Sequence, residues 1–363
     1  MKKLLPALAL LLLITSCQNA DNDQVVCHVQ KDFTQYVNPF IGTSKMGHVF
    51  PGAAAPFGMV QLSPQTNFVE MFDEEGRYYA KTYEYCAGYQ YTDSIIIGFA
   101  HTNFSGTGHS DLGDILVMPI TWELWDSEKV KNWTGPSWRP GKDYYSKFSH
   151  YNELAEPGYY SVFLDDYGIQ AELTTSERVG FHQYTYKEVE DATIILDMIY
   201  NVYHHDEKNV WTSIRVENDT LVTGYRQTRG WARDRKVFFA IAFSEPIKEY
   251  GHERFDQVIY NGFYRRFKEH MNFPEMAGND IRAWFNFGRA DTKIKMKVAL
   301  SPVSTAGALN NMLAEIPHWD FDKVRAETHD KWNAELARVD AEFIQEEDYI
   351  TFYTALYHSF LTP

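Results

Sequence analysis

Hydrophobic and polar residues alternate along the middle of the chain with the period of two that is typical of β-strands. The clearest runs are separated by turns at regular intervals and lie at 160–164, 169–174, 179–186, 193–198, 212–216, 220–225, 237–243, 281–287 and 294–300. Many short strands spaced in this way predict a large antiparallel β-sandwich, in which one face of each strand packs on a core and the other meets solvent. We therefore expect a mainly β domain over residues 33–304.

After residue 304 the pattern changes from a period of two to a helical one. Residues 306–316 and 321–336 predict two linker helices, with Pro317 between them and Asp320 as the N-cap of the second. A third helix begins near Glu346 and carries a broad aromatic face, made of Tyr349, Phe352, Tyr353, Leu356, Tyr357 and Phe360. Since no further sequence remains to cover this face, we expect the chain to be the first part of a longer protein.

The first residues predict export of the protein. Lys2 and Lys3 make the start of the chain basic. Residues 4–14 then form an apolar run that is too short for a stable membrane-spanning helix. The string Ile14-Thr15-Ser16-Cys17 resembles a bacterial lipobox, so we expect residues 1–17 to be a lipoprotein signal peptide and Cys17 to be lipidated. Residues 18–32 then form a tether. These features predict an exported lipoprotein on the periplasmic or cell-surface side of the outer membrane.

Composition and charge narrow the choice of partners. The 363 residues carry a formal net charge of -15, which argues against nucleic acid, because binding phosphates requires a basic surface. Aromatic residues make up 16% of the chain, which suits a sandwich core and also the stacking of sugar rings on aromatic side chains. Cys27 and Cys86 could pair in an oxidising compartment, but nothing fixes their geometry and we expect both thiols to be free.

The residues best suited to bind a ligand lie between two apolar strands predicted at 94–97 and 115–119. Pro119 closes the second of these strands. Residues 98–114 contain four glycines, two histidines, two aspartates and several hydroxyl groups. Glycines let the backbone approach a ligand closely, and polar side chains supply donors and acceptors. The glycine spacing fits neither a dinucleotide fingerprint nor a phosphate-binding loop, and His101 and His109 lack the spacing of a zinc site. We interpret the segment as a loop that binds a hydroxyl-rich ligand, with an ordinary glycine-rich turn as the alternative.

Several long strings of the sequence resemble glycoside hydrolase family 92. They lie at 36–43 (YVNPFIGT), 47–53, 56–64 (PFGMVQLSP), 98–114, 158–162, 171–174, 178–182 and 319–325, and the string 352–358 resembles the first long helix of the family's catalytic barrel. The resemblance implies an N-terminal β-sandwich, linker helices over 305–340 and, at 341–363, the start of a truncated (α/α)6 barrel. It also implies that the full-length protein is an exo-acting, inverting, calcium-dependent α-mannosidase from the Bacteroidota.

The resemblance assigns one side of a mannose-binding pocket to the sandwich. The positions that match family motifs, or replace a family aromatic residue, are Gly47, His48, Tyr83, Gly88, Tyr89, His101, Ser105, Gly106, Thr107, Gly108, Asp111 and Asp114. For Asp111 and Asp114, bracing of the loop is an equal alternative. The family places its catalytic acid, its catalytic base and most calcium ligands in the barrel, so we expect no catalytic residue and no metal ligand in this chain.

Two departures from the family pattern leave the linkage preference open. Members that act on α-1,2 linkages tend to have a tryptophan where residues 83–85 read Tyr-Glu-Tyr, and a cysteine is common at the position of His109. Our first hypothesis is the N-terminal, carbohydrate-binding part of an α-mannosidase of the α-1,2 class, which acts on N-glycans or mannans and is inactive alone. The second is a non-catalytic surface lipoprotein that binds mannose-containing glycans. A purely structural surface protein would leave the polar loop without a purpose.

Overall fold

The structure is a computed structural model that describes residues 31–66, 72–73, 75–109, 111–121, 143–202, 208–254 and 274–361. The chain divides into two units, and nearly all of these residues belong to the unit formed by residues 33–363, to which the following account is confined. The predicted signal peptide, Cys17, Cys27 and nearly all of the tether lie outside the described residues, so what the sequence predicts for them stays a prediction.

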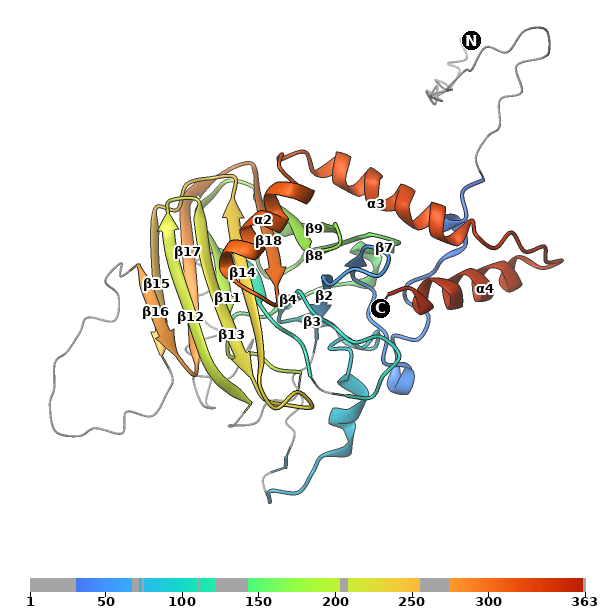
Figure 1. Ribbon diagram of the computed structural model, residues 1–363, viewed down its shortest axis with the longest axis horizontal. Helices are drawn as coiled ribbons and strands as arrows, with labels where there is room; N and C mark the ends of the chain where they lie inside the picture. Colours follow the sequence, from blue (N-terminus) through green and yellow to red (C-terminus); the bar gives the residue numbers. More distant parts are fainter. Residues whose placement is uncertain are drawn as a thin grey trace, which may run out of the picture. The chain divides into compact units, whose positions relative to one another are not determined.

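Two antiparallel sheets form the body of this unit (Figure 1). The first has seven strands, in the order β1 (Ala53–Ala54), β2 (Gln61–Gln65), β4 (Gly98–Ala100), β5 (Leu116–Thr121), β11 (Val189–Asp197), β17 (Ile281–Ala290) and β15 (Glu249–Arg254). The second has nine strands, in the order β16 (Glu275–Gly278), β12 (Asn209–Asn218), β13 (Leu221–Thr228), β14 (Arg235–Phe243), β18 (Lys293–Ser301), β10 (Val179–Thr185), β9 (Ile169–Thr175), β8 (Tyr159–Leu164) and β7 (Glu153–Glu156).

Shorter elements connect the strands of the two sheets. A small ribbon pairs β3 (Ile95–Ile96) with β6 (Ser146–Lys147). The described 3-10 helices are η1 (Thr34–Tyr36), η2 (Lys45–Gly47), η3 (Ala80–Tyr85) and η4 (His150–Asn152).

The hydrophobic core lies between the sheets because each strand turns one row of apolar side chains inward. In β9, Ile169, Ala171 and Leu173 are fully buried, while Gln170 and Glu172 between them are partly exposed. Inward side chains of both sheets join in one hydrophobic cluster. The mainly β sandwich expected from the alternating pattern is therefore confirmed.

The strands beside the polar loop differ from their prediction in two ways. The first difference is that Gly98–Ala100 form β4, so the loop begins three residues later than the sequence suggests. The second is that Pro119 does not close the following strand but lies inside β5, opposite Ile194 of β11. A proline is tolerated there because β4 pairs with β5 at Phe99 and Val117 alone, which leaves β5 without a described neighbour on that side at Pro119.

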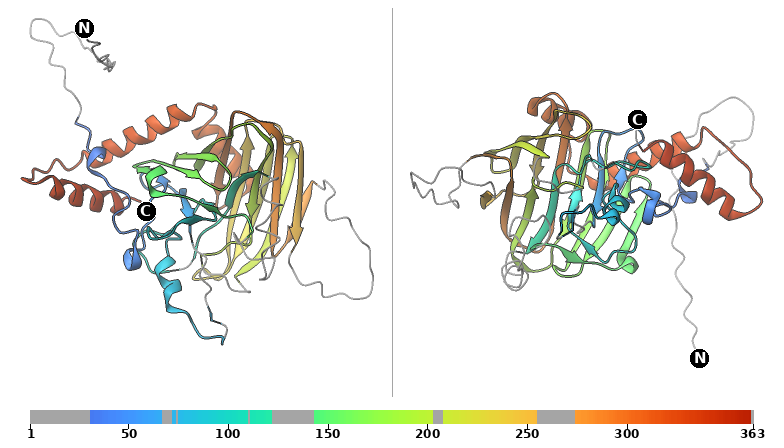
Figure 2. Two further views of the ribbon diagram at one scale, coloured as in Figure 1. Left: turned by 180° about the vertical axis from the view of Figure 1, so that it is seen from behind. Right: turned by 90° about the horizontal axis from the view of Figure 1, so that it is seen from below.

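Three α-helices follow the sandwich, namely α2 (Thr305–Glu315), α3 (Phe321–Leu336) and α4 (Glu346–Ser359). Helix α2 lies against β14 and β18 of the nine-stranded sheet (Figure 1). Asp320 caps α3, as predicted, by accepting a hydrogen bond from the Lys323 N–H at 3.1 Å. Figure 2 shows α3 and α4 beside each other at one end of the sheets in both views.

The aromatic face of α4 is covered in part, so the expectation that nothing in this chain would partner it is wrong. Tyr353 and Tyr357 are fully buried, with ring centroids 5.2 Å from Phe33 and 4.4 Å from Trp332 respectively. The N-terminal segment is held to α3 by the Phe33 N–H, which donates to Asn333 Oδ1 at 2.8 Å. A contact between residues 300 positions apart leaves no local pattern in the sequence, and for this reason the prediction failed.

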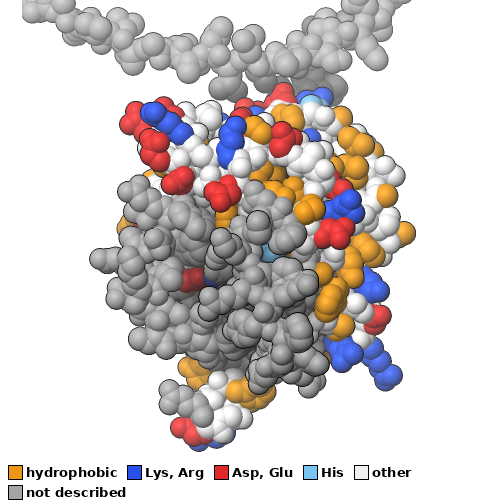
Figure 3. Space-filling model, turned by 90° about the vertical axis from the view of Figure 1, so that its left-hand side faces the viewer, with side chains coloured by type: hydrophobic (Ala, Val, Ile, Leu, Met, Phe, Trp, Pro, Cys, Tyr) orange, Lys and Arg blue, Asp and Glu red, His pale blue; other side chains and the backbone are white. Residues whose placement is uncertain are grey.

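Charged side chains of both signs are mixed on the described part of one face of the protein. On the face drawn in Figure 3, Lys and Arg side chains stand singly or in small groups among acidic and hydrophobic ones. The described part of this face therefore has no continuous basic surface of the kind that binds phosphates. None of the helices in the described ranges is both long enough and apolar enough to cross a membrane.

Candidate functional site

The predicted ligand loop connects β4 to β5, and buried polar side chains hold both of its ends. At its start, Asn103 Nδ2 donates to the Gln61 carbonyl oxygen at 2.8 Å, and Asn103 Oδ1 accepts from Gln65 Nε2 at 2.8 Å. At its end, the Asp114 N–H donates to Thr102 Oγ1 at 3.0 Å, and this hydroxyl donates to the Asp114 carboxylate at 2.6 Å. These five side chains are almost completely buried, so the loop stands on a fixed base.

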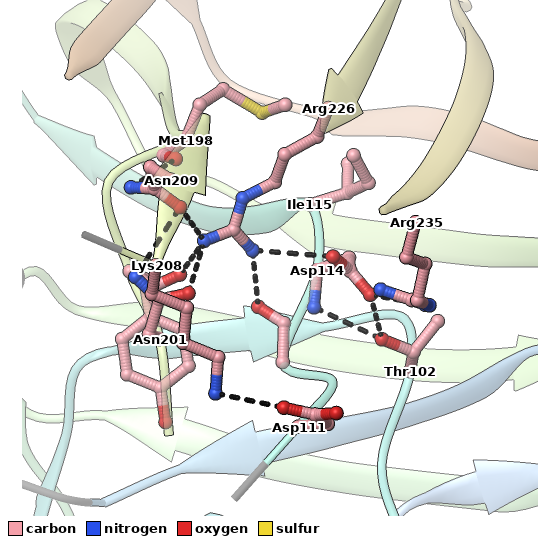
Figure 4. A network of polar contacts seen from close by, with 12 residues as sticks. Thr102, Asp111, Asp114, Ile115, Met198, Asn201, Lys208, Asn209, Arg226 and Arg235 are labelled. Carbon is pink, nitrogen blue, oxygen red and sulfur yellow. Dashed lines mark hydrogen bonds and ion pairs between the residues drawn. The ribbon is translucent and has the colours of Figure 1, made fainter. Parts of the chain in front are cut away.

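Asp114 also belongs to a network of ion pairs beneath the loop (Figure 4). Its carboxylate lies 3.3 Å from Arg226 Nη1 and 2.7 Å from Arg235 Nη2, and the side chains of Asp114 and Arg226 are each 1% exposed. Burial opposes ionisation of this carboxyl group, but the guanidiniums of Arg235 and Arg226 outweigh burial and hold the pKa of Asp114 well below its usual range. The charge of Asp114 is therefore balanced inside the fold.

Arg226 is the centre of this network, and its role was not predicted from the sequence. Its Nη2 donates to Asn201 Oδ1 and Asn209 Oδ1 at 2.7 Å each, and also to the Tyr200 carbonyl oxygen. In Figure 4 the guanidinium lies between these amides and Asp114. Arg226 occupies an inward position of β13, and a basic residue there requires a buried partner. This inward position in the alternating pattern is the sequence feature from which Arg226 could have been identified.

Asp111 makes a second set of contacts, which ties the loop to the turn between β13 and β14. Its carboxylate lies 3.4 Å from Lys208 Nζ and accepts a hydrogen bond from the Trp231 N–H at 2.7 Å. Gly230 is required beside it, because a Cβ there would lie 1.9 Å from Asp111 Oδ1. The Trp231 ring packs on His109, with 3.7 Å between the ring centroids and an angle of 31° between the ring planes.

The exposed tip of the loop meets His48 and Tyr83. Gly106, with φ of 74°, donates its N–H to the His48 carbonyl oxygen at 2.7 Å. Gly108 allows close approach of Tyr83, since a Cβ on Gly108 would lie 1.9 Å from the Tyr83 hydroxyl oxygen. The Tyr83 ring, which is 39% exposed, stands edge-on to the His48 imidazole at a centroid distance of 5.0 Å. We call His48, Tyr83, Gly106 and Gly108 the loop wall.

His48 has two features that are typical of functional residues. Its backbone is left-handed, with φ of 51° and ψ of 43°, which is uncommon outside glycine. Its side chain is 7% exposed, and within the described residues its Nε2 has no hydrogen-bond partner. Burial lowers the pKa of His48, although a hydrogen bond with the Tyr83 backbone and the charge of Glu84 oppose this effect. The neutral ring keeps one nitrogen as a hydrogen-bond acceptor, and Nε2, which lacks a partner in the described part of the chain, is itself buried.

Two of the residues singled out in the sequence lie in the core, away from the loop tip. The Tyr89 hydroxyl donates to the Glu153 carboxylate at 3.0 Å. His101 is fully buried, with Nδ1 2.6 Å from the Ile115 carbonyl oxygen and Nε2 2.8 Å from His182 Nε2. Burial lowers the pKa of His101 to about 4. The structure therefore gives both side chains packing partners inside the sandwich.

The remaining positions surround the loop wall or support it. A Cβ on Gly47 would lie 1.9 Å from a backbone carbonyl oxygen, and one on Gly88 would lie 1.9 Å from Gln65 Oε1. Both glycines are therefore required by close packing. Ser105 and Thr107 are partly exposed at the loop tip. The structure thus brings residues 47–48, Tyr83 and residues 105–108 together, and it places Asp114 beneath them.

Comparison with known proteins identifies the family of the chain. The model of the glycosyl hydrolase family 92 N-terminal domain matches residues 36–301, and the model of the glycosyl hydrolase family 92 catalytic domain matches residues 307–363. The chain belongs to glycosyl hydrolase family 92. The first match covers the two sheets and the loop wall, and the second covers most of α2 together with α3 and α4.

Solved structures of family 92 proteins have the fold of this chain. The α-mannosidase BT3965 from Bacteroides thetaiotaomicron, solved in complex with mannoimidazole, is 36% identical with a TM-score of 0.76, over 92% of this chain and 40% of that protein. The inverting mannosidase BT2199 from the same organism is 27% identical with a TM-score of 0.70, over 92% of this chain and 40% of that one.

A curated relative covers a similar share of the chain. It is an uncharacterized secreted glycosidase of Arthroderma benhamiae, 24% identical over 374 residues, which cover 94% of this chain and 43% of the relative. This family 92 chain thus spans less than half the length of each of these relatives.

Proposed function

We propose that this chain is the N-terminal, carbohydrate-binding part of an exo-acting α-mannosidase of the α-1,2 class, which hydrolyses mannosides of N-glycans or mannans with inversion. The observation that carries the proposal is the match of 92% of the chain, at 36% identity, to an α-mannosidase solved with mannoimidazole. The loop wall supports it, because an exposed tyrosine, a neutral imidazole and a glycine-rich backbone are groups that suit a sugar.

We propose further that the catalytic acid and base lie outside this chain, which is then inactive alone. An inverting glycosidase needs one carboxylic acid to protonate the leaving oxygen and one carboxylate to activate water on the opposite face of the sugar. Asp114 suits neither task, because two arginines hold its pKa low and the carboxylate is buried. Asp111 is held by Lys208 and by the Trp231 N–H. The loop carboxylates therefore serve the fold of the site.

Calcium is also proposed for the complete protein, with ligands from residues outside this chain. Ca2+ takes about six to eight oxygen ligands, many of them carboxylates. The loop carboxylates do not fit this need, since basic groups and backbone N–H groups already engage them. In the described ranges, no group of three or more His, Cys, Asp or Glu side chains could hold a metal ion.

The N-terminal string leads us to propose a lipid anchor at Cys17, on the periplasmic or cell-surface side of the outer membrane. Such a position would bring the protein to mannose-containing glycans outside the cytoplasm. Incorporation of labelled palmitate by the wild-type protein, and its loss in Cys17→Ser, would support the anchor. Equal labelling of both proteins would refute it.

A non-catalytic glycan-binding lipoprotein is the second candidate function. The observation that favours it is the partial cover of the aromatic face of α4 within this chain, because a stable binding module has to bury such a face. In this case the loop wall would hold a glycan without turnover. The two candidates therefore share a binding site and differ in catalysis.

Hydrolysis of α-1,2-, α-1,3- and α-1,6-linked mannobiose, with and without a chelator, separates the candidates. The measurement compares this chain with a longer version that carries a complete family 92 catalytic domain. We expect turnover by the longer, calcium-replete version alone, fastest on the α-1,2 linkage, with β-mannose as the first product in proton NMR. Turnover by the 363 residues alone would refute our placement of the acid and base. Glycan binding without turnover by either version would favour the second candidate.

Substitutions of exposed tyrosines test the loop wall in the longer version. Tyr83→Ala should raise KM, because it removes the exposed ring of the wall. Tyr151→Ala is the matched control, since Tyr151 is 99% exposed and lies outside the wall. Equal kinetics of the two variants would contradict a role of the wall in substrate binding.

A further inference from the structure

Trp231 and His109 form an aromatic pair that is not part of the loop wall. Trp231 is 73% exposed, an unusual position for the largest aromatic side chain, which is normally well buried. One face of the indole is covered by His109, at a centroid distance of 3.7 Å. The exposed area therefore lies mainly on the opposite face and the outer edge of the ring.

Polar contacts fix the backbone that carries this indole. The Trp231 N–H donates to Asp111 Oδ2 at 2.7 Å, and Lys208, whose side chain is almost fully buried, lies 3.4 Å from Asp111 Oδ1. Gly230 packs directly on the same carboxylate. On the other side of the pair, Phe104 stands edge-on to His109, with 6.3 Å between centroids. An aromatic surface held in advance in this way loses little conformational freedom when a ligand binds.

The pair lies next to the loop wall along the chain. Gly108 packs against Tyr83 and His48, and His109, the following residue, packs against Trp231. The two aromatic surfaces are therefore anchored to adjacent residues of one loop. Because consecutive Cα atoms are about 3.8 Å apart, the residues that anchor the two surfaces lie close together.

We propose that Trp231, packed on His109, is a second sugar subsite that binds the ring next to the one held at the loop wall. This proposal rests on the proposed function of the loop wall. The exposed indole face matches the apolar C–H face of a hexose, whereas the loop wall offers polar groups. The occupant is therefore a further hexose of an α-linked manno-oligosaccharide, and the protein favours longer glycans over single mannosides.

Calorimetric binding of two ligands to the 363-residue chain tests the subsite. The ligands are methyl α-mannoside, which has one ring, and α-1,2-linked mannotriose. Trp231→Ala should weaken binding of mannotriose about tenfold and change binding of methyl α-mannoside less than about twofold. Trp231→Phe should retain most of the mannotriose affinity, because a smaller aromatic face remains. Tyr151→Ala, at another exposed aromatic residue, should leave both affinities unchanged.

Tryptophan fluorescence gives an independent readout of the same titrations. Mannotriose, but not methyl α-mannoside, should shift the emission of the wild-type chain, and Trp231→Phe should abolish the shift. An equal loss of affinity for both ligands in Trp231→Ala, or no loss for either, would overturn the second subsite while the loop wall remains. Failure of both the wild-type chain and the longer version with a complete catalytic domain to bind or turn over either ligand would refute sugar binding at the loop wall itself.

Discussion

Replacing Asp114 with asparagine shows whether the charge beneath the loop stabilises the protein. The change keeps the size of the side chain and removes the negative charge that lies 3.3 Å from Arg226 and 2.7 Å from Arg235. Arg226 would then be a buried cation without an anion, and breaking a buried pair in this way costs about 3–5 kcal/mol. Because carbonyl and amide oxygens also accept hydrogen bonds from Arg226, we expect a loss near the lower end, about 3 kcal/mol.

Urea unfolding at neutral pH measures this loss directly. In a thermal scan, Tm should fall by roughly 6 °C, since a chain of this size loses about 2 °C for each kcal/mol. The matched control is Asp73→Asn. In the wild type, the Asp73 carboxylate lies 2.8 Å from Arg77 Nε at the surface. Solvent screens the exposed pair, so this variant should unfold like the wild type.

The pH dependence identifies charge as the cause. Folding lowers the pKa of Asp114, so its contribution to stability is fully present above the unfolded pKa of about 3.9 and is lost as the pH falls below that value. The difference in unfolding free energy between wild type and Asp114→Asn should stay constant from about pH 8 to about pH 5 and shrink below about pH 4. A difference under about 1 kcal/mol at neutral pH, or one that persists in acid, would refute the reasoning.

Four further substitutions, one of them a control, test buried packing and strained glycines by urea unfolding. Burial lowers the pKa of His101 to about 4, so stability should fall by about 3 kcal/mol as the pH drops from about 6.5 to about 4, and His101→Asn should flatten this slope. Gly88→Ala should cost about 2 kcal/mol or more, because the new Cβ would lie 1.9 Å from Gln65 Oε1. Gly168→Ala also has a positive φ, 64°, but open space around it, and should cost only about 1 kcal/mol. Trp332→Phe should cost about 2 kcal/mol, because the buried indole N–H donates to a carbonyl oxygen at 2.6 Å; an unchanged unfolding midpoint would contradict this.

The sandwich could be predicted because its central strands are buried on one face along their whole length. The strands that the alternating pattern did not reveal include β1, β7, β15 and β16, which are the edge strands of the two sheets. An edge strand has one neighbour and can be rich in polar residues, so its hydrophobic pattern is weak. Strand β15, with the sequence EYGHER, is an example. The sequence therefore indicated the fold better than it indicated the full extent of the sheets.

The polar loop could be located from the sequence, but the direction of its side chains could not. His101 and Asp114 are polar residues in a glycine-rich segment, and only the fold shows that both turn into the protein. Arg226 could have been found from its inward position in β13. Trp231 left no comparable signal, since it lies in a turn without periodicity and meets Asp111 from 120 residues away.

If the loop wall binds a sugar as proposed, the two loop aspartates support that binding through the positions in which they hold the loop and Trp231. A sugar hydroxyl exchanges hydrogen bonds with water for bonds with protein, and the net gain for each bond is small. Affinity then depends on groups that are already held in place before the ligand arrives. Asp114 fixes the loop from beneath, and Asp111 fixes the backbone of Trp231. Loss of the first should weaken every sugar ligand alike, whereas loss of the second should weaken longer glycans more than single mannosides.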